Sequence, residues 1–351
     1  MKSSIFEQKL IKRIEEKLPG AAPGIMVQVH QAGKKVCDIA VGETYAYYDL
    51  ASLTKIIFTT QAMIGAFQDG KWNLSSKVKD YLKWFPSEET LILDLLNHSS
   101  GLPWWLPIYK EMNVQQSVED RWKYLQQVLE KVTIEKRDSS VYSDVGFFVL
   151  SFLLQEMYQM PIKSVWLQTK EMYYPRLSID FSENNIPKQP VKYYAPTEKC
   201  PWRGRILHGE VHDENCWALG GISTHAGLFG SIDDIGWFGL YVRGQLHGIS
   251  KTVIKQKTAQ LFATRSRPLG KGDFAIGYMM PTPGASSSGD YFSPYSIGHT
   301  GFTGTSYWYD PAQDLSVAIL SNRVAFGRER EDFKLLRPQI HNWIVEGLRR
   351  S

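Results

Sequence analysis

The chain has 351 residues, a length that can bury a large core in one or two domains without disulfide support. Its formal net charge is only +4, its basic residues are scattered and 43% of its residues are hydrophobic, so the composition is globular and gives no footprint for nucleic-acid binding. The three cysteines are odd in number and widely spaced, which predicts free thiols and excludes a disulfide framework or a Cys-x-x-Cys metal site.

The N-terminal segment predicts an amphipathic helix, because apolar residues recur every four positions from Phe6 to Leu18 among charged ones. It has neither the unbroken apolar stretch nor the small-residue cleavage site of a secretory signal, so we expect a cytoplasmic protein. The next two segments, 24–30 and 35–41, flank a short Ala-Gly-Lys turn and predict an antiparallel hairpin.

The segment from Trp72 to about Leu219 is helical and loop-rich in its pattern. Helices are expected at 91–97, 114–132, 143–158 and 162–173. The longest apolar run, 145–154, is too short to span a bilayer and should form a core helix.

Strand patterns return beyond Gly220. A helix is expected near 233–246, strands at 274–280, 305–309 and 315–320, and a last helix around 336–348. Because strands lie at both ends of the chain, we predict an α+β fold with an antiparallel sheet flanked by helices. Residues 1–71 and 220–351 would form the sheet domain, residues 72–219 a mostly helical inserted domain, and the active site would lie in the cleft between them.

The most informative motif is Ser52-Leu-Thr-Lys55, at the start of a long apolar run. Residues three apart share one face of a helix, so Lys55 could reach the Ser52 hydroxyl. A serine becomes a competent nucleophile only beside a base, and a partly buried lysine with a lowered pKa can act as one. The motif alone is weak, since a helix N-cap followed by a solvated lysine is the commoner meaning.

Two later motifs strengthen it. Tyr142-Ser143-Asp144 opens the most apolar helix of the middle segment, and His299-Thr300-Gly301 precedes a predicted strand. This ordered set is supported by segments 95–103, 211–215, 219–221, 225–229 and 298–305. In these three motifs and five segments, the chain resembles the serine β-lactamase and penicillin-binding-protein superfamily, specifically its class C β-lactamase-like branch of esterases and amidases.

The resemblance implies a β-lactamase-like fold and a covalent acyl-enzyme mechanism. Ser52 would attack a carbonyl carbon, and Lys55 and the Tyr142 phenol would share the proton relay. Proximity of the amine and the phenol would lower the pKa values of both, which are normally near 10. The backbone N–H groups of Ser52 and Phe302 would form the oxyanion hole.

Asp144, His299, Thr300 and Gly301 would border the bound substrate. Two of them depart from the lactamase pattern. Asp144 stands where β-lactamases commonly have asparagine. Its carboxylate cannot donate a hydrogen bond to a substrate amide. His299 stands where lactamases usually have lysine, and a histidine is largely neutral at pH 7. We therefore expect a substrate other than a typical penicillin.

The predicted function is a cytoplasmic serine hydrolase that cleaves an amide or ester of a small molecule, peptide or muropeptide. Carboxylesterases, D-amino-acid amidases or peptidases and muropeptide amidases all fit. A catalytically weak binding protein of the same fold and a true β-lactamase are the alternatives. Serine acyl transfer through this relay needs no cofactor, no nucleic-acid or membrane partner is expected, and the oligomeric state is left open.

Two further groups of residues are ambiguous. The segment 208–225 contains the metal-binding residue types His208, Glu210, His212, Asp213, Glu214 and His225. Their spacing matches no zinc pattern, so we expect no metal, and expect His212 and Asp213 to pin a loop beside the cleft. Trp104, Trp105 and Trp202 could form a sugar- or acyl-binding wall, or pack beneath a long loop.

Overall fold

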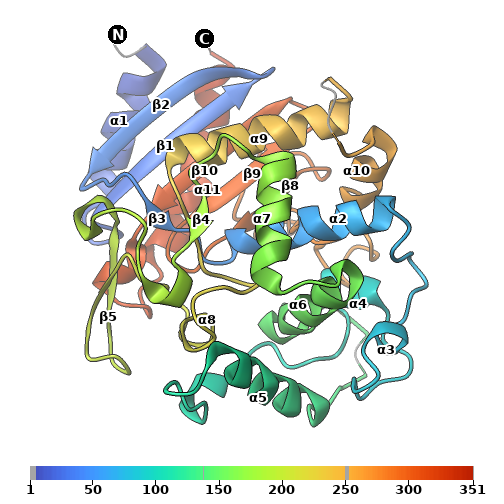
Figure 1. Ribbon diagram of the computed structural model, residues 1–351. Coiled ribbons are helices and arrows are strands. Elements are labelled where there is room, and N and C mark those ends of the chain that lie inside the picture. The colour runs from blue at the N-terminus through green and yellow to red at the C-terminus, as the bar shows by residue number, and fades with distance from the viewer. Residues whose placement is uncertain (1–4, 137, 250–252, 351) are drawn as a thin grey trace.

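The computed structural model describes residues 5–136, 138–249 and 253–350. At its centre is an antiparallel sheet with the strand order β2-β1-β10-β9-β8 (Figure 1). Both ends of the chain contribute to it, with β1 (Gly24–Gln31), β2 (Lys34–Gly42), β8 (Ile297–Thr300), β9 (Ser306–Asp310) and β10 (Leu315–Ser321). The fold is therefore the mixed α+β fold that the sequence predicts.

Helices cover both faces of this sheet. Alternate residues of a strand point to opposite faces, and Ile25 and Val27 of β1 share one core with α1 (Ile5–Lys17) and α11 (Asp332–Leu348). The other face packs against α9 (Ile232–His247). The two termini lie at the same end of the molecule (Figure 1).

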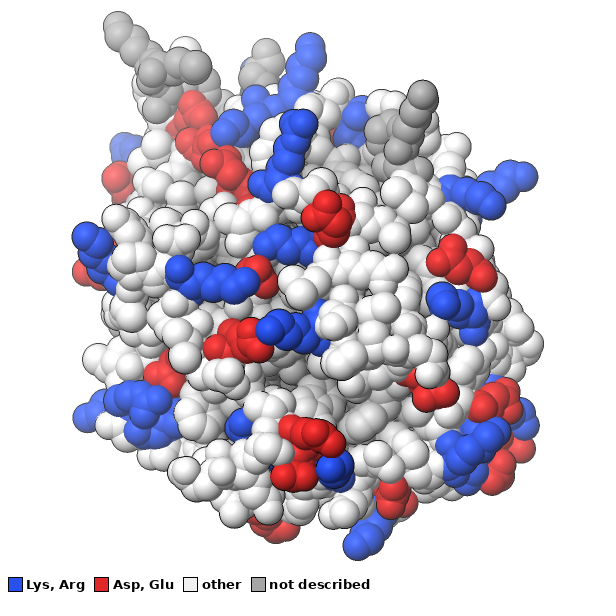
Figure 2. Space-filling model, in the orientation of Figure 1, with Lys and Arg blue, Asp and Glu red and all other residues white. Residues whose placement is uncertain are grey.

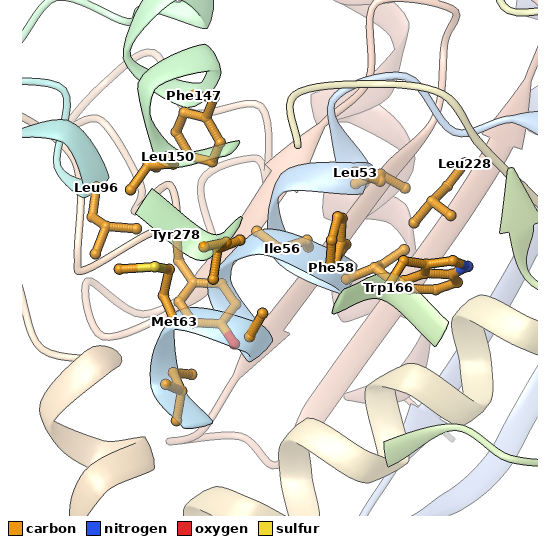
Figure 3. Close-up of a cluster of buried hydrophobic side chains, with 14 of the residues drawn as sticks. Leu53, Ile56, Phe58, Met63, Leu96, Phe147, Leu150, Trp166, Leu228 and Tyr278 are labelled. Atoms are coloured by element: carbon orange, nitrogen blue, oxygen red, sulfur yellow. The ribbon is translucent and has the colours of Figure 1, made fainter. Parts of the chain in front are cut away.

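The remaining helices surround the chain that follows Ser52. They are α2 (Thr60–Gln68), α3 (Val78–Tyr81), α4 (Ile92–Leu96), α5 (Val118–Glu130), α6 (Asp144–Tyr158), α7 (Ile162–Tyr173), α8 (Glu214–Ala218) and α10 (Gln256–Phe262). Figure 3 shows Phe58 and Met63 of the first helical turns among Phe147, Leu150 and Trp166 of α6 and α7. Residues on either side of position 72 therefore share one buried core.

Two small sheets complete the fold. In the first, β7 (Leu228–Gly230) lies between β3 (Tyr48–Asp49) and β4 (Asp180–Phe181), so the residues before Ser52 lie beside those that follow Gly227. The second is the hairpin of β5 (Pro196–Cys200) and β6 (Arg205–His208).

Most long elements match their predicted positions within a few residues, but the predicted strand at 274–280 is wrong. The segment turns back on itself: the Ala275 N–H donates to the Tyr278 carbonyl at 2.9 Å, around Gly277 with its φ of 87°. A positive φ favours glycine and interrupts an extended strand. The short strands β3, β4, β5, β6, β7 and β8 were not predicted. The division into a sheet domain and an inserted domain at residues 72–219 stays a prediction.

On the face in Figure 2, basic and acidic side chains are interspersed, and neither sign forms a continuous patch. Among the described residues no single helix is long and apolar enough to cross a membrane, and α6 and α7 meet that test only as a pair bent by 76°. Cys37, Cys200 and Cys216 are buried and unpaired, as predicted.

Candidate active site

Ser52 lies in a tight turn that follows β3. Ala51 before it has a φ of 46°, in the left-handed region that few residues other than glycine adopt. The buried Asp49 carboxylate holds the turn by accepting the N–H of Ala51 at 2.8 Å and the N–H of His212 at 2.7 Å. The Lys55 N–H donates to the Ser52 carbonyl at 3.0 Å, so the two side chains emerge one turn apart.

Four side chains meet at the Ser52 hydroxyl. Ser52 Oγ lies 2.8 Å from Tyr142 Oη and 3.0 Å from Lys55 Nζ. Asp144 Oδ1 lies 2.7 Å from Lys55 Nζ and accepts a hydrogen bond from Tyr142 Oη at 3.1 Å. Lys55 begins a π-helical turn (Lys55–Thr59), whereas Tyr142 and Asp144 come from the start of α6. The fold thus brings together the first two motifs of the sequence.

Lys55 is fully buried, and its surroundings suit an ammonium group. Its Nζ has three acceptors: Ser52 Oγ, Asp144 Oδ1 and the His225 carbonyl, which lies at 2.8 Å. It also lies 5.1 Å from the ring centroid of Phe147. Burial lowers the pKa of Lys55, while the Asp144 carboxylate acts in the opposite direction.

Tyr142 differs from the expectation. Its pKa is raised well above the usual value, first by burial and second by the Asp144 carboxylate. The prediction that the amine and the phenol have lowered pKa values therefore holds for Lys55 and is wrong for Tyr142. The reasons are burial, which disfavours the charged phenolate most, and the Asp144 carboxylate, which contacts both groups and adds to the penalty. The resting Tyr142 is a neutral phenol that donates to Asp144.

His98 positions Tyr142. The two rings contact each other at a tilt of 36° with centroids 4.8 Å apart, and His98 Nδ1 accepts the Ser143 N–H at 3.0 Å. An accepting Nδ1 places the ring proton on Nε2. Burial lowers the pKa of His98 well below its usual value, so the ring is neutral. The sequence analysis included this residue in segment 95–103 without giving it a role.

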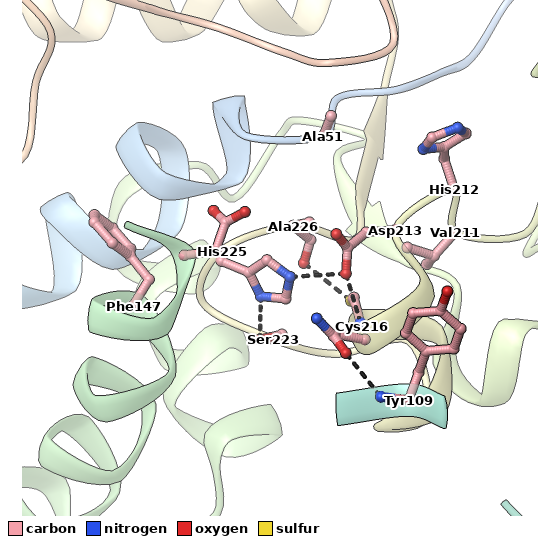
Figure 4. A network of polar contacts seen from close by, with 12 residues as sticks. Ala51, Tyr109, Phe147, Val211, His212, Asp213, Cys216, Ser223, His225 and Ala226 are labelled. Carbon is pink, nitrogen blue, oxygen red and sulfur yellow. Dashed lines mark hydrogen bonds and ion pairs between the residues drawn. The ribbon is translucent and has the colours of Figure 1, made fainter. Parts of the chain in front are cut away.

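His225, whose carbonyl accepts from Lys55 Nζ, belongs to a second polar network. Figure 4 shows this network around the His225 ring. His225 Nε2 lies 2.9 Å from Asp213 Oδ1, and His225 Nδ1 lies 2.8 Å from Ser223 Oγ. Asp213 also accepts the Cys216 N–H at 2.7 Å and caps α8. Asp213 and His225 line the cleft, but Ser223 is fully buried, so its hydroxyl cannot attack a substrate and the network holds the carbonyl that accepts from Lys55. Asp213 does hold a loop beside the cleft.

The segment after β8 is fastened to the Ser52 turn. Thr303 Oγ1 donates to the Asp49 carbonyl at 2.7 Å, and Thr305 Oγ1 donates to the Leu50 carbonyl at 3.0 Å. A Cβ at Gly301 would lie 2.7 Å from the Leu50 oxygen, so only glycine permits this approach. Phe302 follows directly, and its backbone therefore lies beside the turn that carries Ser52.

His299 is buried in β8 and neutral. Its Nδ1 lies 2.8 Å from the Thr300 carbonyl, which can only accept, so Nδ1 carries the proton and Nε2 is an acceptor. Burial, with the Lys55 charge, lowers the pKa of His299 to about 3. Nε2 has no hydrogen-bond partner among the described residues. This position offers the cleft an acceptor and no positive charge.

A cleft of about 650 Å³ lies over Ser52. Of the residues predicted for the site, it is lined by Ser52, Tyr142, Asp144, His299, Thr300, Gly301 and Phe302. Trp104, 62% exposed, stacks on Trp105 at 5.8 Å, and both line the cleft. Trp202 instead packs against Tyr109 and Trp217.

An antiparallel sheet with helices on both faces, and a Ser-x-x-Lys pair beside a tyrosine in its cleft, define a β-lactamase- or penicillin-binding-protein-like hydrolase. The sequence model described as "Beta-lactamase" matches residues 11–339. Because the match spans most of the sequence, the chain belongs to the β-lactamase family.

Relatives of the chain carry hydrolase names. It is 28% identical over 365 residues to "N-acetylmuramyl-L-alanine amidase" of Bacillus subtilis (strain 168), covering 90% of this chain and 80% of that protein. It is 29% identical over 309 residues to a "Putative D-alanyl-D-alanine carboxypeptidase" of Salmonella agona (strain SL483), covering 80% and 70%. The structure of EstCE1, "a hydrolase with promiscuous acyltransferase activity", shares the fold, with a TM-score of 0.72 at 17% identity over 96% and 97% of the chains.

Proposed function

We propose that the protein is a serine hydrolase that cleaves an amide or ester through an acyl-enzyme on Ser52. The observation that carries this proposal is the contact of Ser52 Oγ with both Lys55 Nζ at 3.0 Å and Tyr142 Oη at 2.8 Å. A hydroxyl at its free pKa is a weak nucleophile, and a neighbouring proton acceptor activates it. The cleft over Ser52 gives a substrate access to it.

The hydrogen bonds suggest a direction for the proton. Lys55 donates to Ser52 Oγ, which leaves the serine proton free to point at Tyr142 Oη, and Tyr142 donates to Asp144. As Oγ bonds to the carbonyl carbon, the serine proton moves to Tyr142 while the phenolic proton moves to Asp144. The phenol stays neutral throughout, in keeping with the raised pKa of Tyr142. Lys55 remains charged and stabilises the developing negative charge on Oγ.

The reverse transfer completes the reaction. Tyr142 donates its proton to the leaving nitrogen or oxygen and recovers one from Asp144, and the bond from the carbonyl carbon to the leaving group breaks. A water molecule then attacks the acyl-enzyme by the same path and releases the acid. The N–H groups of Ser52 and Phe302 are the proposed donors to the carbonyl oxygen.

Amides of the muropeptide type are the substrates that we propose first, and simple esters second. Support comes from the names of the two relatives, an amidase of N-acetylmuramyl-L-alanine and a putative carboxypeptidase. The stacked Trp104 and Trp105 give the cleft a broad flat wall beside the nucleophile. A cytoplasmic location stays a prediction, which fractionation of expressing cells would test.

β-Lactams are proposed to be poor substrates. The carboxylate of Asp144 can only accept hydrogen bonds and is already engaged by Lys55 and Tyr142, and His299 is uncharged. Turnover of a chromogenic cephalosporin tests this directly. A kcat/KM at or above about 10⁴ M⁻¹s⁻¹ would contradict it.

The experiment that tests the nucleophile is intact-protein mass spectrometry after exposure to a nitrophenyl phosphonate. The wild type should gain one adduct, Ser52→Ala none, and Tyr142→Phe should react more slowly. Ser139→Ala, which changes an exposed serine outside the cleft, is the matched control and should react like the wild type. An unreactive wild type would overturn the proposal and favour a binding protein that keeps the fold.

A further inference from the structure

A cluster of buried side chains lies where β5 approaches the start of α8. Glu198 and Cys200 are two residues apart on β5, so both point to the same face of the strand, and both are buried. Glu214 begins α8 and is also buried. One carboxylate oxygen of each glutamate and Cys200 Sγ all lie within 4.8 Å of one another. Three potential ligand atoms thus converge from two segments of the chain.

His212 brings a fourth potential ligand to this cluster. Its side chain is 6% exposed, and its Nε2 lies 3.3 Å from Glu198 Oε1. Nε2 is buried and forms no hydrogen bond within the described part of the chain, whereas buried polar atoms normally have a partner. The His212 N–H donates to Asp49 at 2.7 Å, which fixes the backbone. The imidazole is therefore held with an unpartnered nitrogen towards the carboxylate.

Arg328 supplies the positive charge at the two carboxylates. Its Nη2 donates to Oε1 of Glu198 and to Oε1 of Glu214, so the guanidinium bridges them. Unlike the buried residues around it, Arg328 has a side chain that is 32% exposed, and this side chain can rotate into the solvent. The cluster thus already stabilises a cation, but the guanidinium uses neither the imidazole nitrogen nor the sulfur.

The donor atoms fit zinc better than magnesium or calcium. Zn²⁺ takes thiolate sulfur, imidazole nitrogen and carboxylate oxygen in a tetrahedral site, whereas Mg²⁺ and Ca²⁺ take oxygen ligands. Bonds of about 2.0 to 2.3 Å space tetrahedral ligands by roughly 3.3 to 3.8 Å, so the cluster would contract by about 1 Å. Arg203 favours a thiolate at Cys200, because its Nε donates to Cys200 Sγ at 3.3 Å.

We propose that Glu198, Cys200, His212 and Glu214 form a structural zinc site. As Zn²⁺ binds, the zinc–sulfur bond forms, the thiol proton of Cys200 passes to the solvent, and the Arg328 guanidinium leaves the carboxylates. No atom changes its oxidation state. With four protein ligands the site is closed, which is typical of structural rather than catalytic zinc.

The ion would tie β5 to the start of α8 at the wall of the cleft that His212 and Glu214 line. Segment 208–225 has no zinc spacing by itself, because two of the four ligands come from β5. The inference does not rest on the proposed function, since Ser52 takes no part in the site.

The first test is the absorption spectrum of the wild type during titration with Co²⁺, which can replace zinc and reports its ligands. We expect visible bands of tetrahedral cobalt and a thiolate-to-cobalt charge-transfer band, both complete at one equivalent and abolished by Zn²⁺. Cys200→Ser should lose the charge-transfer band. Cys37→Ser, which changes a buried cysteine of β2, is the matched control and should keep it. No such band in the wild type, or an unchanged band in Cys200→Ser, would overturn the site.

The second test is Zn²⁺ affinity, measured by competition with a chromogenic chelator. Cys200→Ser and His212→Gln should each bind at least about 100-fold more weakly, because the loss of an outer-shell partner alone typically costs 10- to 100-fold. Arg328→Gln, at a temperature where circular dichroism shows it folded, should bind more tightly, because the ion no longer displaces a guanidinium. Arg330→Gln changes an exposed arginine that pairs with Asp332 and should bind like the wild type. Unchanged or weaker binding by Arg328→Gln would overturn the site.

Thermal unfolding separates this inference from the proposed function. Zn²⁺ should raise the midpoint of the wild type as its concentration increases, because a ligand of the folded state stabilises it. Ser52→Ala and Cys37→Ser should show the same rise, and Cys200→Ser should show none. If the wild type forms no phosphonate adduct but its midpoint rises, the proposed function fails and the zinc site stands. An adduct on Ser52 without any zinc-dependent rise overturns the zinc site alone.

Discussion

Asp144 contacts both groups that hydrogen-bond to the Ser52 hydroxyl, Lys55 and Tyr142, and its charge affects the pKa of each. It lies 2.7 Å from Lys55 Nζ, where it favours the ammonium, and it accepts from Tyr142 Oη at 3.1 Å, where it disfavours a phenolate. An asparagine at this position would make similar contacts without the charge. The residue type at 144 therefore decides where the serine proton can go.

Asp144→Asn should lower the rate of phosphonate labelling of Ser52 by roughly 10²-fold, because the amide cannot take the phenolic proton. The pKa of Tyr142 should fall, since the carboxylate that raises it is gone, and the pKa of Lys55 should also fall. The basic limb of the pH–rate profile should accordingly move to lower pH. The rates of phosphonate labelling, measured across the pH range, give both the loss of reactivity and the shift of the basic limb.

Asp138→Asn removes an exposed carboxylate that pairs with Lys271 and should leave the rate and the profile unchanged. If Asp144→Asn retained wild-type labelling at every pH, the proton path through Tyr142 to Asp144 would be wrong. Lys55 would then be the remaining proton acceptor.

At the scale of elements, Arg328 joins three separate segments. Its side chain, in the segment between η5 and α11, binds Glu198 of β5 and Glu214 at the start of α8. Glu198 is almost fully buried, and the hydrogen bonds from Arg328, together with His212 whose Nε2 lies 3.3 Å away, outweigh its burial and lower its pKa to about 2. This cluster fixes one wall of the cleft, which Arg328 and Glu214 line.

Arg328→Gln should destabilise the fold by up to about 3 kcal/mol near neutral pH, the value of the whole lowering of the Glu198 pKa from 4.5 to about 2, to which His212 also contributes. A carboxyl whose folded-state pKa is lowered stabilises the fold above its unfolded pKa. The difference from the wild type should therefore be largest above pH 4.5 and shrink as the pH falls towards 2. Urea unfolding at several pH values measures it.

Arg13→Gln, which breaks the exposed pair with Glu346, is the comparison and should cost less than about 1 kcal/mol at any pH. A pH-independent loss in Arg328→Gln would instead point to lost packing.

The threonines after β8 connect two elements that the mechanism needs together. Thr303→Val removes the hydrogen bond to the Asp49 carbonyl, behind the Ser52 turn. We expect the labelling rate of Ser52 to fall about tenfold, with a stability loss of only about 1 to 2 kcal/mol, because one buried acceptor loses its partner. Thr264→Val, which removes an exposed hydroxyl from the end of α10, should change neither. An unchanged labelling rate in Thr303→Val would show that this bond does not position the nucleophile.

Local sequence patterns predicted the long helices and strands. They failed for segments whose conformation depends on tertiary contacts. The repeat of apolar residues identified α6, and alternation around a short turn identified β1 and β2. β8 has only four residues, too few for a pattern, and takes its strand conformation from pairing with β9. Segment 274–280 alternates like a strand but turns at Gly277.

The same distinction applies to the candidate site. Motif order named Ser52, Lys55 and Tyr142, which the structure brings within hydrogen-bond distance of one another or of a shared partner. The contact of Asp144 with Lys55 joins residues far apart in the chain and has no sequence signature.

At the scale of the whole molecule, the predicted domains share a core. Phe58 belongs to the segment that leaves the sheet region, yet its ring packs edge-on against Trp166 of α7 at 5.4 Å and near Phe181 of β4 at 6.0 Å. The helix that carries Lys55 therefore completes the core of the helical region. The cleft cannot keep its geometry if one region unfolds alone.

Phe58→Ala should lower the free energy of unfolding by about 3 to 5 kcal/mol, the usual cost of truncating a buried phenylalanine. Because the core is shared, the loss should appear equally in α6 and in β10, measured as hydrogen-exchange protection of peptides from each at increasing urea. Phe326→Ala truncates a phenylalanine that is 45% exposed and should change both by less than about 1 kcal/mol. If Phe58→Ala weakened α6 and left β10 at its wild-type protection, the two regions would unfold independently. The cleft would then open in a partly folded state that a cooperative molecule never populates.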